Sequence, residues 1–449
     1  MGNVFKNGLI RSHGTVSSFW ALFVLRVDRL LTPQRLRLYP LFFLVASALG
    51  VSFAVVIRIV APAMQGALMP DYLAHWTGGR LLLMPGIGSL YDPEVQSALQ
   101  STSVGTDVPL SWFVSAPVVA VFYAPLALLP YNLSGLIWLL ISSTLLVWCV
   151  LNLRTLAPGL MARKKSTVIL SVLSSPVVFE LLGGGQDSAF ILAVWLVGIR
   201  LLARQHSLWA GAVFGLGFAK PQLVVVVPLI FLVSRNYRAL ASFVATCALL
   251  LGISVAVVGP GGFQQWLATL GSSLYMQEVQ QGQAWKMVGL PSFAHALLPP
   301  EWGTWIAPGL TLLPLPVGAT ILIVHILKKR TTETTPVWIA ALATIATFSP
   351  HLAVYDAILF VPVIVFLLER QASPVLRVCT VGAFGLLYAT PALHLAAALL
   401  PWPLTILGAP WAALPLAVVW WQSIRYLGRT SSHSQSLVAG ANSVEPSPT

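Results

Sequence analysis

Long apolar segments recur along nearly the whole chain and are separated by short polar ones. A helix needs about 20 apolar residues to cross a bilayer core of about 30 Å. Some segments reach that length, whereas proline and glycine interrupt others and predict broken helices. The pattern predicts an all-α, polytopic bundle of transmembrane helices with about 10–12 spans. The apolar segments are 39–62, 113–130, 131–152, 166–183, 188–203, 207–219, 221–234, 239–259, 305–327, 336–349, 352–368, 375–399 and 403–424.

Basic residues lie mainly in the short polar segments between the apolar ones. Lysine and arginine are enriched in cytoplasmic loops, so these segments predict the orientation of the chain. The predicted cytoplasmic segments are the lead 1–38 and the loops 154–165, 204–206, 235–238, 328–330, 369–377 and from 425 onward.

The same orientation divides the chain into a transmembrane domain, 39–427, and a Ser-rich tail, 428–449, which is predicted to be disordered. Segments 63–112 and 260–304 become external loops. In the lead, the stretch from Phe19 to Leu31 is amphipathic and is predicted to lie along the membrane surface.

The predicted orientation contains one span too many between residue 112 and Arg154. Either 113–130, which contains three prolines, enters the membrane without crossing it, or the basic loop after Arg154 breaks the charge rule. We favour a segment that does not cross.

Composition agrees with a membrane protein. Of 449 residues, 57% are hydrophobic and 8% are charged, compared with about 25% charged in soluble domains. The net charge of +12 lies in the loops and forms no separate basic face, which excludes nucleic-acid binding. Cys149, Cys247 and Cys379 lie in apolar segments and have neither disulfide nor metal-ligand spacing.

Acidic residues are rare, and they are functional candidates because ionisable groups near a bilayer are costly. The predicted topology leaves nine of the 13 acids on or near the outer side. Motifs for nucleotide triphosphates, zinc proteases and serine hydrolases are absent from the sequence, which disfavours ATP-driven pumps and the usual hydrolases.

Four polar clusters lie on the predicted outer side. They are residues 70–92 with Asp71, His75, Arg80, Tyr91 and Asp92; 183–187 with Gln186 and Asp187; 220–222 with Lys220; and 349–356 with His351 and Asp356. The last three lie where an apolar segment meets the outer surface, so we expect them to converge on one cavity.

Each cluster also has a purely structural interpretation. The glycines at 183–185 can end a helix, and Lys220 can extend its amine to the lipid headgroups. His351 and Asp356 can cap or anchor a helix. Asp71 can be a solvated loop acid, and His75 and Arg80, which flank Trp76, can be structural. Tyr91-Asp92-Pro93 is typical of a turn.

At these clusters the sequence resembles glycosyltransferase family 87, membrane mannosyltransferases of the GT-C type that use polyprenyl-phosphate sugars. The matching elements lie in order over about residues 40–370. Ser115-Ala116-Pro117 departs from the family's Tyr-Pro-Pro. The matching elements are Asp71, then 86–92 (GIGSLYD), Gly185-Gln186, Ala210-Gly211, Lys220-Pro221, Ser349-Pro350-His351 and Tyr355-Asp356.

The resemblance implies transfer of a hexose, with mannose expected, from a polyprenyl-phosphate sugar to a lipid or glycan acceptor. It implies Asp71 as the general base of an inverting displacement. Lys220, His351 and Arg80 are the cations available for the leaving phosphate. His75, Tyr91, Gln186 and Asp356 complete the expected substrate site, and neither a metal nor another cofactor is required.

A secondary transporter or flippase has the same hydropathy and is the main alternative; an assembly protein is a further one. A transporter places its ionisable groups near the bilayer midplane. Here they lie at the outer ends of the apolar segments, beside a long external loop, which favours the transferase. The expected location is the cytoplasmic (inner) membrane, with several passes.

Overall fold

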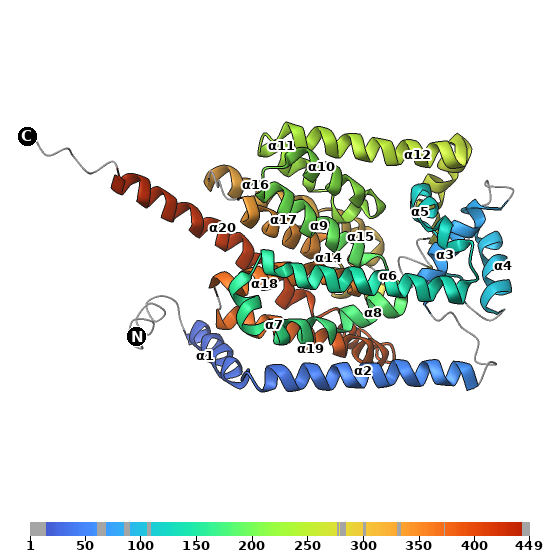
Figure 1. Ribbon diagram of the computed structural model, residues 1–449. Helices are drawn as coiled ribbons and strands as arrows, with labels where there is room; N and C mark the ends of the chain where they lie inside the picture. The colour runs from blue at the N-terminus through green and yellow to red at the C-terminus, as the bar shows by residue number, and fades with distance from the viewer. Residues whose placement is uncertain are drawn as a thin grey trace, which may run out of the picture.

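The computed structural model describes residues 15–60, 69–84, 90–105, 109–275, 278, 284–299, 302–329, 334–371 and 373–441. These residues form helices and contain no strand, only an isolated bridge between Met287 and Ala353. The predicted all-α helical bundle is therefore confirmed (Figure 1).

The α-helices are α1 (Thr15–Leu30), α2 (Arg35–Val60), α3 (Pro70–Leu82), α4 (Pro93–Val104), α5 (Pro117–Ala127), α6 (Tyr131–Asn152), α7 (Pro158–Leu173), α8 (Pro176–Gly184), α9 (Ser188–Ala203), α10 (Ser207–Gly215), α11 (Val227–Val233), α12 (Tyr237–Leu270), α13 (Ser273–Tyr275), α14 (Leu290–Ala296), α15 (Gly303–Leu312), α16 (Pro314–Lys329), α17 (Thr334–Phe348), α18 (Phe360–Gln371), α19 (Pro374–Ala397) and α20 (Ala413–Ala441). The 3₁₀ helices are η2 (Leu153–Thr155), η3 (Leu216–Ala219), η4 (Pro221–Leu223), η6 (Ala284–Lys286), η8 (Val354–Leu359) and η9 (Leu404–Gly408).

Fewer helices can cross a membrane alone than the spans that the sequence predicts. Within the described residues, five helices are long and apolar enough, or six if α7 and α8, which are bent by 54°, form one span. The remaining apolar helices are shorter, and α5, α9 and α17 have 10–17 residues each. Pro176 begins α8 at the bend after α7, whereas one candidate span, Gly309–Lys328, continues across Pro314.

Helices α3 and α4, from the segment predicted to be the first external loop, lie with α5 at one end of the molecule (Figure 1). Figure 1 shows α3, α4 and α5 gathered there, while α2, α6 and α12 run lengthwise. Helix α5 has 11 residues and reaches about 16 Å, half of a bilayer core. The Tyr131 hydroxyl at the start of α6 accepts a hydrogen bond from the Met69 amide beside α3 (3.1 Å). That 113–130 enters the membrane without crossing it stays a prediction.

Glycines allow α3 and α5 to pack closely. A Cβ at Gly79 would lie 2.9 Å from the Ala124 amide nitrogen, and one at Gly78 would meet the Phe113 ring. Next to this contact Asp92 caps α4, where its carboxylate accepts a hydrogen bond from the Glu94 amide (2.9 Å). Asp92 thus has the turn role expected from the sequence.

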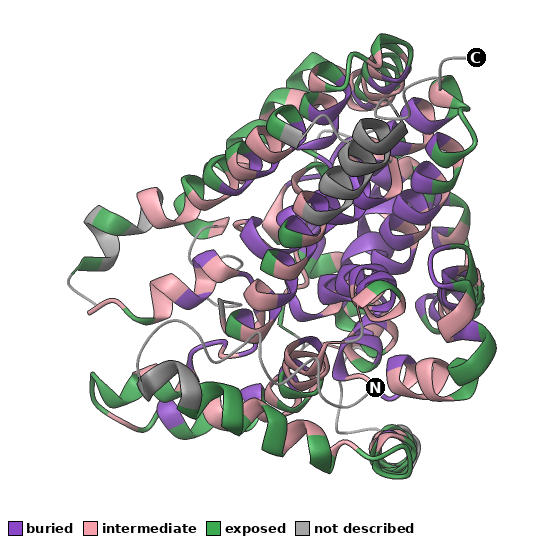
Figure 2. Cartoon of the chain, turned by 90° about the vertical axis from the view of Figure 1, so that its left-hand side faces the viewer, coloured by how far each residue is buried: buried purple, intermediate pink, exposed green. Residues whose placement is uncertain are grey.

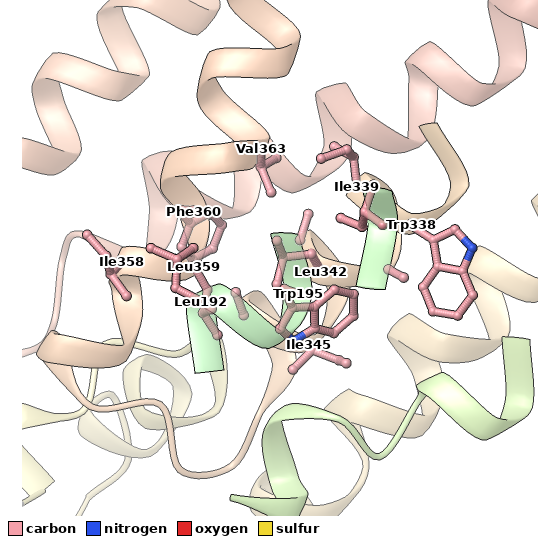
Figure 3. Close-up of a cluster of buried hydrophobic side chains, with 14 of the residues drawn as sticks. Leu192, Trp195, Trp338, Ile339, Leu342, Ile345, Ile358, Leu359, Phe360 and Val363 are labelled. Carbon is pink, nitrogen blue, oxygen red and sulfur yellow. The ribbon is translucent and has the colours of Figure 1, made fainter. Parts of the chain in front are cut away.

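The main core lies where α9, α17 and α18 meet. Residues 336–348 of α17 are all buried, as expected for a helix that is apolar on every face. Trp195 and Trp338 are buried in this core (Figure 3), and the Trp195 indole donates to the Leu223 carbonyl (3.2 Å). Buried residues concentrate in the middle of the molecule, and exposed ones on the outer helices (Figure 2). This core fixes the start of α9, where the candidate site lies.

The outer helices expose apolar residues. On α1, Phe19 and Trp20 are more than half exposed, as expected for a helix lying on a membrane surface. Asp28 holds α1 against α19 through Arg377 (Oδ2 to Nη2, 2.6 Å). The hydrogen bond from Arg377 keeps the pKa of Asp28 below its usual value.

The C-terminal segment differs from its prediction. Helix α20 extends to Ala441, so the backbone of 428–441 is helical where a disordered tail was expected. Because the next proline is Pro446, no proline stops the helix in this segment. Residues 442–449 lie outside the described residues, as do 85–89 of the glycine-containing pattern before Tyr91.

Candidate active site

Lys220 is the centre of a buried group of charges. It lies between η3 and η4, and its Nζ is 2.8 Å from Asp187 Oδ1 and 3.0 Å from Asp356 Oδ1. Asp187 precedes α9, and Asp356 lies in η8. The exposed fractions of the three side chains are 14%, 8% and 2%. Three segments far apart in the sequence therefore meet at one cation.

Two neutral side chains complete this group. Lys220 donates to Gln186 Oε1 (3.4 Å) and to Ser188 Oγ (3.3 Å), and Ser188 donates to Asp356 Oδ1 (2.6 Å). We call Lys220, Asp187, Asp356, Gln186 and Ser188 the Lys220 network. One cation with two carboxylates leaves a net charge of about −1, and burial makes each charge costly unless it is paired.

The glycine sequence before Gln186 shapes the backbone at the network. Gly185 ends α8 with φ +74°, the left-handed conformation that favours glycine. Its carbonyl accepts a hydrogen bond from Trp138 Nε1 (2.8 Å). A Cβ at Gly185 would lie 2.5 Å from Tyr72 Cβ. The glycines therefore end the helix and also let α3 approach the network.

Asp71 lies beside this turn. It is in the first turn of α3, after Pro70, where the helix dipole favours a carboxylate. A Cβ at Gly184 would lie 2.7 Å from Asp71 Oδ2, so the carboxylate faces the Gly184 backbone closely. Asp71 is partly exposed. It forms no hydrogen bond or ion pair with any other residue that the structure describes.

His75 is one turn further along α3 and is buried. Its ring stacks on Tyr123 of α5 (centroids 4.6 Å apart, planes at 4°). Neither His75 Nδ1 nor the Tyr123 hydroxyl has a hydrogen-bond partner within the described part of the chain. Burial lowers the pKa of His75, although the charges of Asp187 and Asp71 oppose the shift. His75 is therefore a buried ring on which the charges of both carboxylates act.

The segment 349–356 brings His351 to the network, where the charges of Asp356 and Lys220 act on its ring. This segment is held by the strand-like pairing of Met287 with Ala353 and by the bond from the Val288 amide to the Leu352 carbonyl (2.8 Å).

Lys286 directly precedes Met287, which pairs with Ala353 of the segment 349–356. Lys286 is partly exposed, and its charge acts on Glu180, as does the charge of Asp71. It forms no ion pair within the described residues. We call Asp71 and Lys286 the rim. Sequence reasoning missed Lys286 because its segment has the composition of an amphipathic surface stretch.

Arg80 and Tyr91 are directed elsewhere. Arg80 donates to the Ala127 carbonyl (3.3 Å), and the Tyr91 hydroxyl donates to the Ser115 carbonyl (2.8 Å). The structure records no contact of either side chain with the Lys220 network. Of the eight residues expected from the sequence, Gln186, Lys220 and Asp356 belong to the network, and Asp71, His75 and His351 lie beside it.

The arrangement is that of a polar site without a metal-ligand cluster. Among the described residues, no three His, Cys, Asp or Glu side chains are grouped to hold a metal ion. Lys220 instead occupies the position between Asp187 and Asp356. Such carboxylates and amide groups can accept hydrogen bonds from sugar hydroxyls.

Fold and site define a helical membrane protein with a buried charge network next to a partly exposed carboxylate. The sequence model of glycosyltransferase family 87 matches residues 113–350, more than half of the chain. The chain therefore belongs to glycosyltransferase family 87, and this membership indicates a glycosyltransferase. No curated protein and no solved structure matches the chain. The matched range includes Asp187 and Lys220, whereas Asp71 and Asp356 lie outside it.

Proposed function

We propose that the chain transfers a hexose, expected to be mannose, from a polyprenyl-phosphate sugar to a lipid or glycan acceptor. The reaction takes place at the outer face of the cytoplasmic membrane and inverts the anomeric carbon. The observation that carries this proposal is the position of the Asp71 carboxylate against Gly184, next to the Lys220 network.

Asp71 is the proposed general base because it differs from the other two acids. Asp187 and Asp356 are each in contact with Lys220, whereas Asp71 is partly exposed and unpaired within the described residues. As the acceptor oxygen bonds to the anomeric carbon, its proton passes to Asp71. The bond from that carbon to the phosphate oxygen breaks, and polyprenyl phosphate leaves. A positioned base of this kind contributes about 10²- to 10⁴-fold.

The network is proposed to orient the sugar. Gln186, Asp187 and Asp356 offer oxygens to its hydroxyl groups, and Lys220 fixes these oxygens by its contacts with all three. His75 is proposed to line the same space, where its unpartnered Nδ1 can bind a hydroxyl. Tyr91 supports this region indirectly, through its bond to Ser115 before α5.

The leaving phosphate needs a cation. Lys220, proposed for this role from the sequence, would first have to give up a contact with an aspartate. Lys286 has no carboxylate within ion-pair distance among the described residues, and its charge acts on the same carboxyl as that of Asp71. We therefore assign the phosphate first to Lys286, and His351 and Arg80 are the further candidates.

A comparison of donors tests the function. Purified protein is incubated with a membrane glycolipid extract and radiolabelled mannose on either a short-chain polyprenyl phosphate or GDP. We expect label to reach the acceptor fraction from the polyprenyl donor alone. Transfer from the nucleotide sugar alone would contradict the proposed donor. Movement of a sugar or lipid across vesicles without any transfer would favour the transporter alternative.

A further inference from the structure

A second polar feature lies at the opposite end of α9. A cavity of about 240 Å³ opens between the last turns of α6 and α9. Its lining includes Trp148, Asn152 and Thr155 from one side and Arg200 and Arg204 from the other. Arg200 is 13 residues beyond Asp187, about 20 Å along the helix. The cavity is therefore separate from the Lys220 network.

Helical spacing builds this cavity. Trp148 and Asn152 are four residues apart and lie on one face of the last turns of α6. Thr155 follows in η2, and Arg204 follows the last residue of α9, one turn after Arg200. Arg200 donates to Asn152 Oδ1 (3.3 Å), which holds the two faces together. The cavity thus lies between the ends of two packed helices and the residues that follow them.

The two arginines are not neutralised. Neither guanidinium forms an ion pair with a carboxylate in the part of the chain that the structure describes. The recorded side-chain bond of Arg200 goes to a neutral amide rather than to a helix carbonyl. Both side chains are exposed. Two such cations in one cavity favour an anion with several acceptor oxygens, as a phosphate has.

The other walls point to a lipid source for that phosphate. Leu196, Val197 and Leu201 make one side apolar. Trp148 is 40% exposed, and tryptophan is enriched where a membrane meets water. Helix α6 is one of the candidate spans, and its basic end is the predicted cytoplasmic one. Basic pockets between membrane helices on the cytoplasmic side bind anionic headgroups.

We infer that this cavity binds the phosphate headgroup of an anionic phospholipid. Arg200 and Arg204 contact the phosphate, and the Leu196 to Leu201 wall lies along the start of an acyl chain. The site anchors the cytoplasmic end of the α6–α9 pair and takes no part in sugar transfer.

Native mass spectrometry of the detergent-purified protein tests the inference with dioctanoyl phosphatidylglycerol. We expect one saturable lipid per chain, and binding at least about 10-fold weaker in the double variant Arg200→Gln/Arg204→Gln. Val197→Phe fills the cavity without removing a charge and should weaken binding similarly. If the double arginine variant does not fold, lipid binding by Val197→Phe tests the proposal.

The matched control removes two exposed cations outside the cavity, Lys165→Gln and Arg238→Gln, and should bind the lipid as the unmodified protein does. Equal binding of dioctanoyl phosphatidylcholine would overturn the assignment to an anionic lipid. Displacement of the lipid by inorganic phosphate at equal concentration would assign the cavity to free phosphate instead. Unchanged binding in Val197→Phe would also overturn the proposal.

Discussion

The Lys220 network and the rim both contain lysine and aspartate side chains, but the network's charges are buried and paired, whereas those of the rim are partly exposed and unpaired within the described residues. In the network, one lysine lies within 3.0 Å of two aspartates, and all three side chains are mostly buried. On the rim, Asp71 and Lys286 are partly exposed and form no ion pair within the described residues. Every charge of the network therefore has an ion-pair partner, whereas neither charge of the rim has one among the described residues.

This difference predicts two kinds of mutational effect. Removing one partner from a buried ion pair leaves an uncompensated charge and strongly destabilises a fold. Removing an exposed, unpaired charge costs little stability, so its effect should appear in catalysis. Stability and turnover therefore have to be measured separately for each variant.

The largest effect is expected from Lys220→Met, which leaves Asp187 and Asp356 buried without a cation. The free energy of unfolding should fall by about 3–5 kcal/mol, and Lys220→Arg should retain part of it. Thermal unfolding in detergent measures the loss, with Lys286→Met as the control that keeps stability. If Lys220→Met and Lys286→Met unfold at the same temperature, the ion pairs of the Lys220 network do not stabilise the fold.

Two neighbouring glycines offer a finer test of the rim. A methyl group at Gly184 would meet Asp71 Oδ2 at 2.7 Å, whereas one at Gly183 would have nothing within 4 Å. Because the obstructed atom ends a side chain, Gly184→Ala should displace the carboxylate and leave the fold intact. A displacement of about 1 Å can cost up to about 10²-fold in rate, so we expect turnover about 30-fold lower.

The comparison is with Gly183→Ala, whose turnover should match that of the unmodified protein. Equal rates in the two alanine variants would show that the position of Asp71 against Gly184 is irrelevant to transfer.

A smaller effect is expected from Lys286→Met. One hydrogen bond to a charged group is worth about 1.5–3 kcal/mol, so the KM for the polyprenyl donor should rise about tenfold or more. Lys286→Arg should recover much of this loss. Initial rates at varied donor concentration separate KM from kcat. An unchanged KM in Lys286→Met would contradict this assignment, and Lys220 or His351 would then be the residue that binds the phosphate.

Much of the fold was predictable because hydrophobic patterning acts locally. The apolar segments 131–152 and 188–203 coincide with α6 and α9. The segment 305–327 is split at Pro314 into α15 and α16, because proline in the first turn starts a new helix. Pattern and proline thus define most helices, but the pattern overestimates how many are long enough to cross alone.

The site was predictable only in part. Its residues were identified as polar groups at the ends of apolar segments, but their pairing depends on packing between distant segments. Lys220 and Asp356 are 136 residues apart in the chain, so no local pattern indicates their contact. Asp187 was visible next to Gln186, and only the structure identifies it as a partner of Lys220. Tyr91 was expected from the family-like pattern and Arg80 as an available cation, but the side chains of both bond to backbone carbonyls away from the network.

The most direct test of this account is the turnover of purified Asp71→Asn with a short-chain polyprenyl-phosphate mannose, normalised to folded protein. The substitution keeps the size of the side chain and removes its basicity. Because Asp71 is unpaired within the described residues, the unfolding temperature should stay at that of the unmodified protein. Transfer should fall by at least about 10²-fold. Near-normal turnover in the folded variant would contradict the assignment of Asp71 as the base.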